Sequence, residues 1–395
     1  MHPTNKLNTQ PFFFVFVVGL LLYFLSSINL WNNQMTGGAS TLSEERWLLY
    51  SGIFLVATSA MVWRTTRFFK MEGIHVVCVL WICLMPIFIL YNKGSFGDCV
   101  YTILWPLLFE ASYVCGSVGS RYVDSLKKVF IVLAIWGTFL FLQTRVNLFE
   151  RETAQSNTIY FSFLTLPWLL LVKKKNHRLF LLILFTILVV WSLKRSAMLA
   201  VVLCWSCYML MLLKRKRNKL LGTILIAVVL SGGILGYSFS DSILKGELSE
   251  RVNREETDEG RNRLAIYTVT WAMIENSSVD KLFFGHGHYG VRKDSFLEIS
   301  AHNDFLEVIY DYGLVILVLY LGLWVYVIKR CVRLFRDESP LFLPYAVSLS
   351  IFIVMSMVSH LILYCSYFLF LVLFWGSIEG AYFSQHDVRK QIQIK

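Results

Sequence analysis

The sequence predicts an all-α, polytopic membrane protein with about twelve transmembrane helices and one large loop outside the bilayer. Of its 395 residues, 56% are hydrophobic and 16% are charged, whereas soluble proteins carry about 25% charged residues. Apolar runs long enough to cross a bilayer recur from end to end. Only residues 240–304 form a long polar interruption. We therefore expect nine spans in residues 1–239, the loop in 240–304, and three spans with a C-terminal tail in 305–395.

The spans follow from apolar segments of roughly 15 to 24 residues. The first, residues 11–30, exceeds the core of about 7–15 residues that a signal peptide has, and no small-residue cleavage site follows it. We therefore predict that it is retained as a span. The predicted spans are residues 11–30, 47–63, 75–91, 99–118, 129–143, 158–172, 179–193, 197–213, 220–239, 305–328, 341–358 and 361–383.

Lysine and arginine predict the orientation, because short cytoplasmic connections are enriched in both. With the N-terminus inside, 23 of the 37 basic residues fall on the cytoplasmic side, and eight of the others lie in the long loop, where the rule has little force. The runs "KKKNHR" and "KRKRNK" are both cytoplasmic in this arrangement. Both termini are predicted to be cytoplasmic, and the net charge of +11 reflects topology rather than a nucleic-acid partner.

Cysteine usage predicts no disulfide framework. The eight cysteines lie in or beside spans or in a cytoplasmic connection, and the long loop has none. The "CWSC" segment, Cys204–Cys207, has redox-motif spacing but lies inside a span without a βαβ context. We interpret it as core packing.

The middle of the loop, "TDEGRNRLAIYTVTWAMIENSS", is predicted to be an amphipathic helix. Polar and acidic residues suited to a helix N-terminus come first, and Arg261 and Arg263 lie in the first turns. We expect this helix to rest on the membrane with its aromatic side down. Its apolar residues recur at helical spacing: Leu264, Tyr267, Trp271 and Ile274.

The loop returns to the membrane through polar residues that the helix itself does not require. In "KLFFGHGHYG" the glycines permit a tight turn, and we assign them mainly a structural role. Asp304 is predicted to cap the tenth span, with Glu307 completing a capping box. Asp304, Glu307 and Asp311 fall on one helical face, which we expect to line a wet cavity because carboxylates are costly in lipid. His302 and Asn303 precede this face.

The turn between spans seven and eight carries Lys194 and Arg195 on the side that should be poor in positive charge. These side chains could extend toward outer headgroups. Alternatively, Arg195 faces an anionic ligand, and Arg195, Arg261 and His302 converge on one site at the outer interface.

This pattern resembles the superfamily of O-antigen ligases and O-antigen or exopolysaccharide polymerases of bacterial envelopes. The family's short outer turn of the form S-R-G-A is matched by "KRSA" at 194–197. Its loop arginine, tryptophan and E-N-P segment are matched by Arg261, Trp271 and "ENS" at 275–277. Its G-x-G and H-N-x-x-L segments are matched at 285–287 and 302–306. The altered turn and the missing proline are departures, and Arg263 competes for the role given to Arg261.

The resemblance implies a GT-C-like fold in the inner membrane and glycosyl transfer at its periplasmic face. The implied donor is an undecaprenyl-diphosphate-linked oligosaccharide, and the implied acceptor is a glycan or lipid A-core. Membrane lipids and other polysaccharide assembly proteins are the further expected partners; no cofactor and no metal are expected. Arginine binds diphosphate through donors that stay charged, and histidine is the natural base near neutral pH. We accordingly predict catalytic roles for Arg195, Arg261 and His302. Substrate-binding roles are predicted for Lys194, Arg263, Trp271, Asn303, Asp304, Glu307 and Asp311.

Several alternatives remain open at this stage. His286, His288, His302 and Asp304 have spacings that could bind zinc. A flippase would need intramembrane charges along a path, and Glu110 is the clear intramembrane acid. A purely structural scaffold would leave the outer-turn arginine unexplained. Within the enzyme interpretation, the acids of "HNDFLE" favour a polymerase with a sugar-only acceptor over a ligase that acts on lipid A-core.

Overall fold

The computed structural model describes residues 10–35, 42–64, 73–147, 158–192, 194–216, 259–359 and 361–393. Within these ranges the chain forms helices and no strand, so the prediction of an all-α fold is confirmed. The first helices are α1 (Gln10–Met35), α2 (Leu42–Arg64), α3 (Gly73–Tyr91), α4 (Phe96–Val118), α5 (Ser120–Asn147), α6 (Ile159–Phe163), α7 (Leu166–Leu169), α8 (Lys175–Trp191) and α9 (Arg195–Lys216). The others are α12 (Glu259–Glu275), α13 (Val279–Phe284), α14 (Gly290–Asp294), α15 (Asp304–Arg336), α16 (Phe342–Val358) and α17 (Cys365–Gln393).

Eight helices in the described ranges are long and apolar enough to cross a membrane, which makes the chain a multi-pass membrane protein. Helices α8 and α16 are shorter and match two further predicted spans. The predicted span at 158–172 is divided between α6 and α7, and Pro167 stands in the first turn of α7, where its missing N–H costs nothing. The predicted span at 220–239 lies outside the described residues, so the count of twelve stays a prediction.

Helices α4 and α17 form the centre of the bundle and are the most buried of the candidate spans. A Cβ on Gly380 of α17 would lie 2.0 Å from the carbonyl oxygen of Tyr113 on α4. Only glycine therefore allows this approach, as small residues do between membrane helices generally.

In the described part of the chain, two buried pairs of a basic and an acidic side chain join helices inside the bundle. His75 Nδ1 of α3 lies 3.0 Å from both carboxylate oxygens of Glu110 on α4. Arg330 of α15 pairs with Glu379 of α17. Glu110 is thus not the only buried acid of the spans, and each pair joins two helices.

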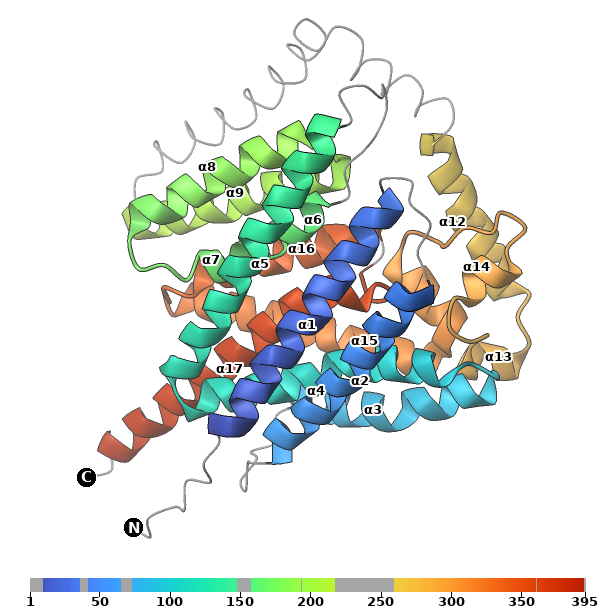
Figure 1. Cartoon of the computed structure of the whole chain (residues 1–395), viewed down its shortest axis with the longest axis horizontal. Coiled ribbons are helices and arrows are strands. Elements are labelled where there is room, and N and C mark those ends of the chain that lie inside the picture. The colour runs from blue at the N-terminus through green and yellow to red at the C-terminus, as the bar shows by residue number, and fades with distance from the viewer. Residues whose placement is uncertain are drawn as a thin grey trace, which may run out of the picture.

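Helices α12, α13 and α14 gather at one end of the bundle (Figure 1). The first turn of α1 and the last turns of α17 lie at the opposite end (Figure 1). We call the end that carries α12–α14 the loop side of the molecule. The described residues of the motifs discussed above, from the outer turn to Gly313, lie on this side.

Candidate functional site

A kink in α15 positions the loop-side segments. Gly313 has φ 79° inside this helix, a conformation that favours glycine. The kink frees the carbonyl groups of the preceding turn, because the amides that would normally reach them are displaced. The loop fills the gap: the N–H of His286 donates to Tyr310 O at 2.9 Å, and the N–H of Gly287 donates to Asp311 O at 2.8 Å.

The two backbones approach so closely at this joint that side chains cannot fit. A Cβ on Gly313 would lie 2.2 Å from the carbonyl oxygen of Phe283, and a Cβ on Gly285 would lie 2.2 Å from that of Asp311. The structural role predicted for the glycines of "KLFFGHGHYG" agrees with this geometry.

Asp304 does not cap α15; it holds the connection between α16 and α17. Its Oδ1 accepts hydrogen bonds from the N–H groups of Leu361 (2.9 Å) and Ile362 (3.3 Å). Its Oδ2 accepts one from the Tyr320 hydroxyl at 2.9 Å. The side chain is completely buried, where a carboxylate is stable only among donors of this kind.

The N-cap of α15 is Asn303, so the predicted capping box of Asp304 and Glu307 is wrong. The Asn303 side-chain oxygen accepts from the N–H groups of Phe305 and Leu306 at 3.0 and 3.3 Å. Its Nδ2 donates to the carbonyl oxygen of Met357 at the end of α16. Asparagine is among the best N-caps, and the cap begins one residue earlier than the acidic pattern suggested.

Glu307 and Asp311 hold two further loop segments in the same way. Glu307 accepts a hydrogen bond from the N–H of Ala301, next to His302. Asp311 accepts one from the N–H of Val291 at 2.9 Å, which fixes the start of α14. Both side chains are fully buried. The face predicted to line a wet cavity instead binds backbone amides of three connecting segments.

Tyr160 joins the outer turn to α12. Its hydroxyl is hydrogen-bonded to that of Ser196, and the Lys194 ammonium lies 5.9 Å from the centre of its ring. Arg263, on α12, lies near enough for an electrostatic interaction with this hydroxyl. Tyr160 is therefore in direct contact with the outer turn and has a positive charge of α12 in its surroundings.

Tyr267, also on α12, contacts the backbone of His302, the predicted base. Its hydroxyl lies 3.1 Å from Met357 O and 3.4 Å from His302 O. Burial raises the pKa of Tyr267, and the charge of Arg263 opposes this only in part. The phenol is therefore neutral and donates hydrogen bonds at physiological pH.

His302 itself has a backbone φ of 55° and is half-buried. Histidine is one of the few residue types enriched in this left-handed region. The hydrogen bonds at Ala301 and Asn303 hold the residue on both sides. The backbone of His302 is thus fixed by its neighbours, and the role of its imidazole stays a prediction.

The structure brings together the segments that carry the predicted site, but it does not describe every side chain. Arg195 is the first residue of α9, and Arg261 lies in the first turn of α12. Both side chains lie outside the described part of the structure, so their convergence stays a prediction. Lys194, Arg263 and Asn303 are the predicted substrate-binding residues whose described contacts place them in the cluster around Tyr160 and Tyr267.

Helix α12 packs on the protein through only part of its apolar residues. Ile266 and Ile274 pack with Val291, Ala301 and Tyr310 in a small second core. Trp271 is 52% exposed, and its Nε1 donates to Glu275 at 2.7 Å. Of the predicted apolar stripe, Ile274 is thus buried in the protein and Trp271 is exposed, and contact of the aromatic side with the membrane stays a prediction. The substrate-binding role of Trp271 stays a prediction.

The two histidines of the glycine turn have separate partners. His286 Nε2 lies 3.0 Å from Ser277 Oγ, and the ring stacks on Tyr310 with centres 4.0 Å apart. His288 is buried and hydrogen-bonded to the Tyr312 hydroxyl. Burial lowers the pKa of His286, and it lowers that of His288 to about 4.

The zinc alternative would need these side chains together. Among the described residues, no three His, Cys, Asp or Glu side chains are grouped so that they could hold a metal ion. His286 and His288 point to different partners, and Asp304 binds the α16–α17 connection.

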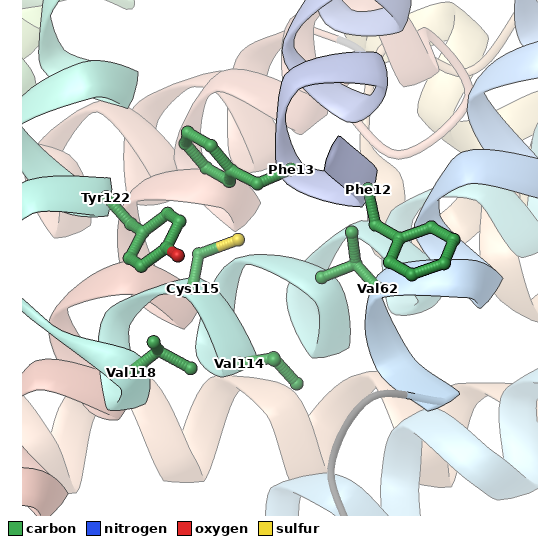
Figure 2. A pocket seen from close by; sticks show the side chains of 7 residues that line it. All are labelled: Phe12, Phe13, Val62, Val114, Cys115, Val118 and Tyr122. Atoms are coloured by element: carbon green, nitrogen blue, oxygen red, sulfur yellow. The ribbon is translucent and has the colours of Figure 1, made fainter. Parts of the chain in front are cut away.

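The opposite end of the bundle carries an apolar pocket between α1, α2, α4 and α5. Figure 2 shows its lining: Phe12, Phe13, Val62, Val114, Cys115, Val118 and Tyr122. None of these side chains is charged, and the pocket therefore lacks the groups that would bind a phosphate or orient a sugar.

Sequence reasoning missed Tyr160, Ser196 and the hydroxyl of Tyr267. Tyr160 reads as an ordinary apolar residue of a span, and Tyr267 as part of a membrane-facing stripe. Their polar role depends on which segments meet at the loop side. The "KRSA" turn was the one local signal for Ser196.

Comparison with known proteins addresses the same segment. Residues 180–321 match the family model described as O-Antigen ligase. The matched range includes the outer turn, α12, α13, α14 and the kinked first half of α15. No curated protein matches the chain.

Proposed function

Because the chain belongs to the O-antigen ligase and polymerase superfamily, we propose that it transfers a glycan from a polyprenyl-diphosphate-linked oligosaccharide to a sugar hydroxyl. In this proposal the loop side is periplasmic, both termini are cytoplasmic and the membrane is the bacterial inner membrane. The observation that carries the proposal is the hydrogen bond from Tyr267 of α12 to the His302 carbonyl, together with the contacts of the outer turn with Tyr160, near Arg263 of α12.

Positive charge at this junction suits the leaving group. As the glycosidic bond breaks, the diphosphate gains negative charge, and cations held in advance stabilise it most effectively. Lys194 and Arg263 both act on Tyr160. Arg195 and Arg261 lie one and two residues from them, and we assign these two arginines the diphosphate, with Arg263 as an additional ligand.

His302 would accept the proton of the attacking hydroxyl group. Its strained backbone is held by neighbouring hydrogen bonds, which would keep the imidazole in place. Asn303 and Trp271 would contact the sugars. Attack from the face opposite the diphosphate would invert the anomeric carbon, and the proposed residues supply this chemistry without a metal ion.

The buried carboxylates would act on the reaction indirectly. Asp304, Glu307 and Asp311 bind backbone amides, which supports a positioning role in place of direct sugar contact. Each of them holds a segment that borders the cluster.

The acceptor separates two candidate functions. A polymerase would extend a glycan that stays on its lipid carrier, and we keep this as the first candidate. The acids of "HNDFLE" favoured it, but Asp304 and Glu307 are buried and lend it less support than the sequence suggested. A ligase would move the finished glycan to lipid A-core, and this is the second candidate; the family match covers both activities.

Deletion of the gene, followed by electrophoresis of extracted glycans, separates the candidates. Core carrying a single repeat unit indicates a lost polymerase, whereas long lipid-linked chains beside bare core indicate a lost ligase. Movement of a labelled lipid-linked glycan across the membrane without bond transfer would support the flippase alternative and contradict the proposal.

Complementation of the deletion tests the site. His302→Ala and Arg261→Ala should each fail to restore the glycan pattern, although both proteins should insert at normal levels. Arg292→Ala is the matched control, because Arg292 is an exposed arginine of the same loop. Full complementation by His302→Ala would remove the proposed base.

A further inference from the structure

The sequence predicts that α12 rests on the membrane, and the structure adds a second helix that could do so. One side of α12 packs inside the protein through Ile266 and Ile274. Helix α13, in contrast, has no buried residue. Val279 is 73% exposed and Phe283 is 46% exposed. These two residues are four apart and share one face of the helix.

The same short helix also has a side that faces the protein. Leu282 packs against the small core of Ile266, Ile274 and their neighbours. The exposed apolar face is therefore a defined side of a docked helix. Exposed side chains of this size, gathered in one place, mark a surface that contacts something apolar.

Helix α13 lies at the loop-side end of α3 (Figure 1). The ring of Phe284 lies 5.3 Å from that of Phe88 and 5.7 Å from that of Tyr91. Lys281 lies 5.5 Å from the centre of the Tyr91 ring and is hydrogen-bonded to Asn92. The helix is thus fixed to the last turn of α3.

Helix α3 is a candidate span, and one side of it is exposed along its length. The exposed residues recur at helical spacing and end beside α13: Val76, Leu80, Cys83, Ile87 and Leu90. In a spanning helix such a stripe faces lipid. Phe96, at the start of α4, is 69% exposed and extends this surface on the loop side.

We propose that α13 is an interfacial anchor whose Val279–Phe283 face is embedded in the lipid leaflet on the loop side. The face belongs to a helix that packs on the last turn of α3, where the exposed stripe of α3 ends, and the partly exposed rings of Tyr91 and Phe284 lie at this contact, as aromatic residues do at membrane interfaces. The occupant is the acyl-chain region of membrane lipid. Asp280 is exposed and borders this face, three residues before Phe283, and its carboxylate is directed to the headgroups and water.

The anchor has a consequence for the site. Helix α13 ends at Gly285, which docks on the Gly313 kink of α15. The depth of α13 in the leaflet therefore determines the depth of this joint. The His302 segment immediately precedes the same helix α15, so its depth in the membrane would change together with that of the joint.

Photocrosslinking in a bilayer tests the proposal. The photoreactive residue p-benzoylphenylalanine replaces Phe283 or Val279 in the full chain, reconstituted in phosphatidylethanolamine and phosphatidylglycerol. Ile87, in the lipid-facing stripe, is the positive control. Monodisperse elution in detergent shows that each variant is folded, and mass spectrometry counts lipid adducts.

Positions 279 and 283 should give lipid adducts at a level similar to that of position 87, since this apolar face enters the acyl region. Absence of lipid adducts at 279 and 283, with normal labelling at 87, would overturn the proposal. Crosslinks from 283 to a second copy of the chain would overturn it too, because they would show that protein covers the face. Neither outcome depends on the proposed glycosyl transfer.

Discussion

Replacement of Asp304 by alanine tests whether the buried carboxylates at the start of α15 serve the fold or the substrate. The change removes the acceptor for the N–H groups of Leu361 and Ile362 in the α16–α17 connection. Tyr320 loses one partner but keeps the Ser356 hydroxyl at 3.0 Å. The connection is buried at Leu361, which is 0% exposed, so water does not replace the lost acceptor without further unfolding.

The expected loss of stability follows from the two orphaned amides. A buried donor without a partner costs about 1–3 kcal/mol, so the total is about 2–6 kcal/mol. The unfolding entropy of a chain of 395 residues is about 0.8 kcal/mol per kelvin, which converts this loss to a melting temperature lower by about 3–7 °C. Asp304→Asn keeps one oxygen that can accept from the two amides, so it should lower the melting temperature by less than half as much as Asp304→Ala does.

The assay uses the protein's own thiols. Most cysteines of the described residues are buried and free, and a thiol-reactive fluorophore therefore reports unfolding in detergent. Glycan complementation is measured in parallel. If Asp304→Ala melted within about one degree of the wild type and still failed to complement, the carboxylate would contact substrate, and the structural explanation would be refuted.

Three further predictions follow from the loop side. Gly313→Ala should prevent accumulation of folded protein, because its Cβ would lie 2.2 Å from a carbonyl oxygen; Gly322→Ala in the same helix, with 3.2 Å to the nearest atom, should behave normally in size-exclusion chromatography. Burial lowers the pKa of His288 from 6.5 to about 4, so between these two pH values the unfolded state binds more protons than the folded state. The free energy of unfolding should therefore fall by roughly 3 kcal/mol as the pH drops through this range. Melting curves of His288→Asn should lack this slope; an unchanged slope would assign it to other groups. Tyr160→Phe removes the hydroxyl bonded to Ser196 and should slow transfer about tenfold in a reconstituted assay with lipid-linked donor; a wild-type rate would remove Tyr160 from the site.

Much of the architecture is readable from the sequence because a bilayer imposes local requirements. A span needs a sufficient run of apolar residues whatever its neighbours are. Helices α1, α3 and α9 accordingly begin and end within a few residues of the predictions. The segments of the candidate site were also visible, because Lys194 and Asn303 are polar where the local pattern calls for neither charge nor amide.

The hydrogen-bond partners of those polar residues could not be predicted from the sequence. Asp304 and Glu307 have the spacing of a capping box, and the sequence offers no sign that distant amides compete for them. Asn303 captured the helix N-terminus because the connection after α16 brought Leu361 within reach of Asp304. The capping-box rule failed here because hydrogen bonds from distant backbone amides stabilise the buried Asp304 carboxylate better than the local amides of the helix N-terminus would.

Helix α12 shows the same limit on the apolar side. The helical spacing selected Leu264, Tyr267, Trp271 and Ile274, but it did not show which of them the protein would bury. The kink at Gly313 and the turn at Gly285 place a small core beside Ile266 and Ile274, and Trp271 stays exposed.

The sequence by itself determined that this chain resides in the membrane, where its spans run and which segments carry unusual charge, because hydrophobicity and charge are properties of each segment alone. Only the tertiary structure decided which backbone amides the buried carboxylates bind and which tyrosine joins Lys194 to Arg263. The reason is physical: a buried polar group takes its partner from whatever the fold places within about 3 Å, and that neighbour can lie anywhere along the chain.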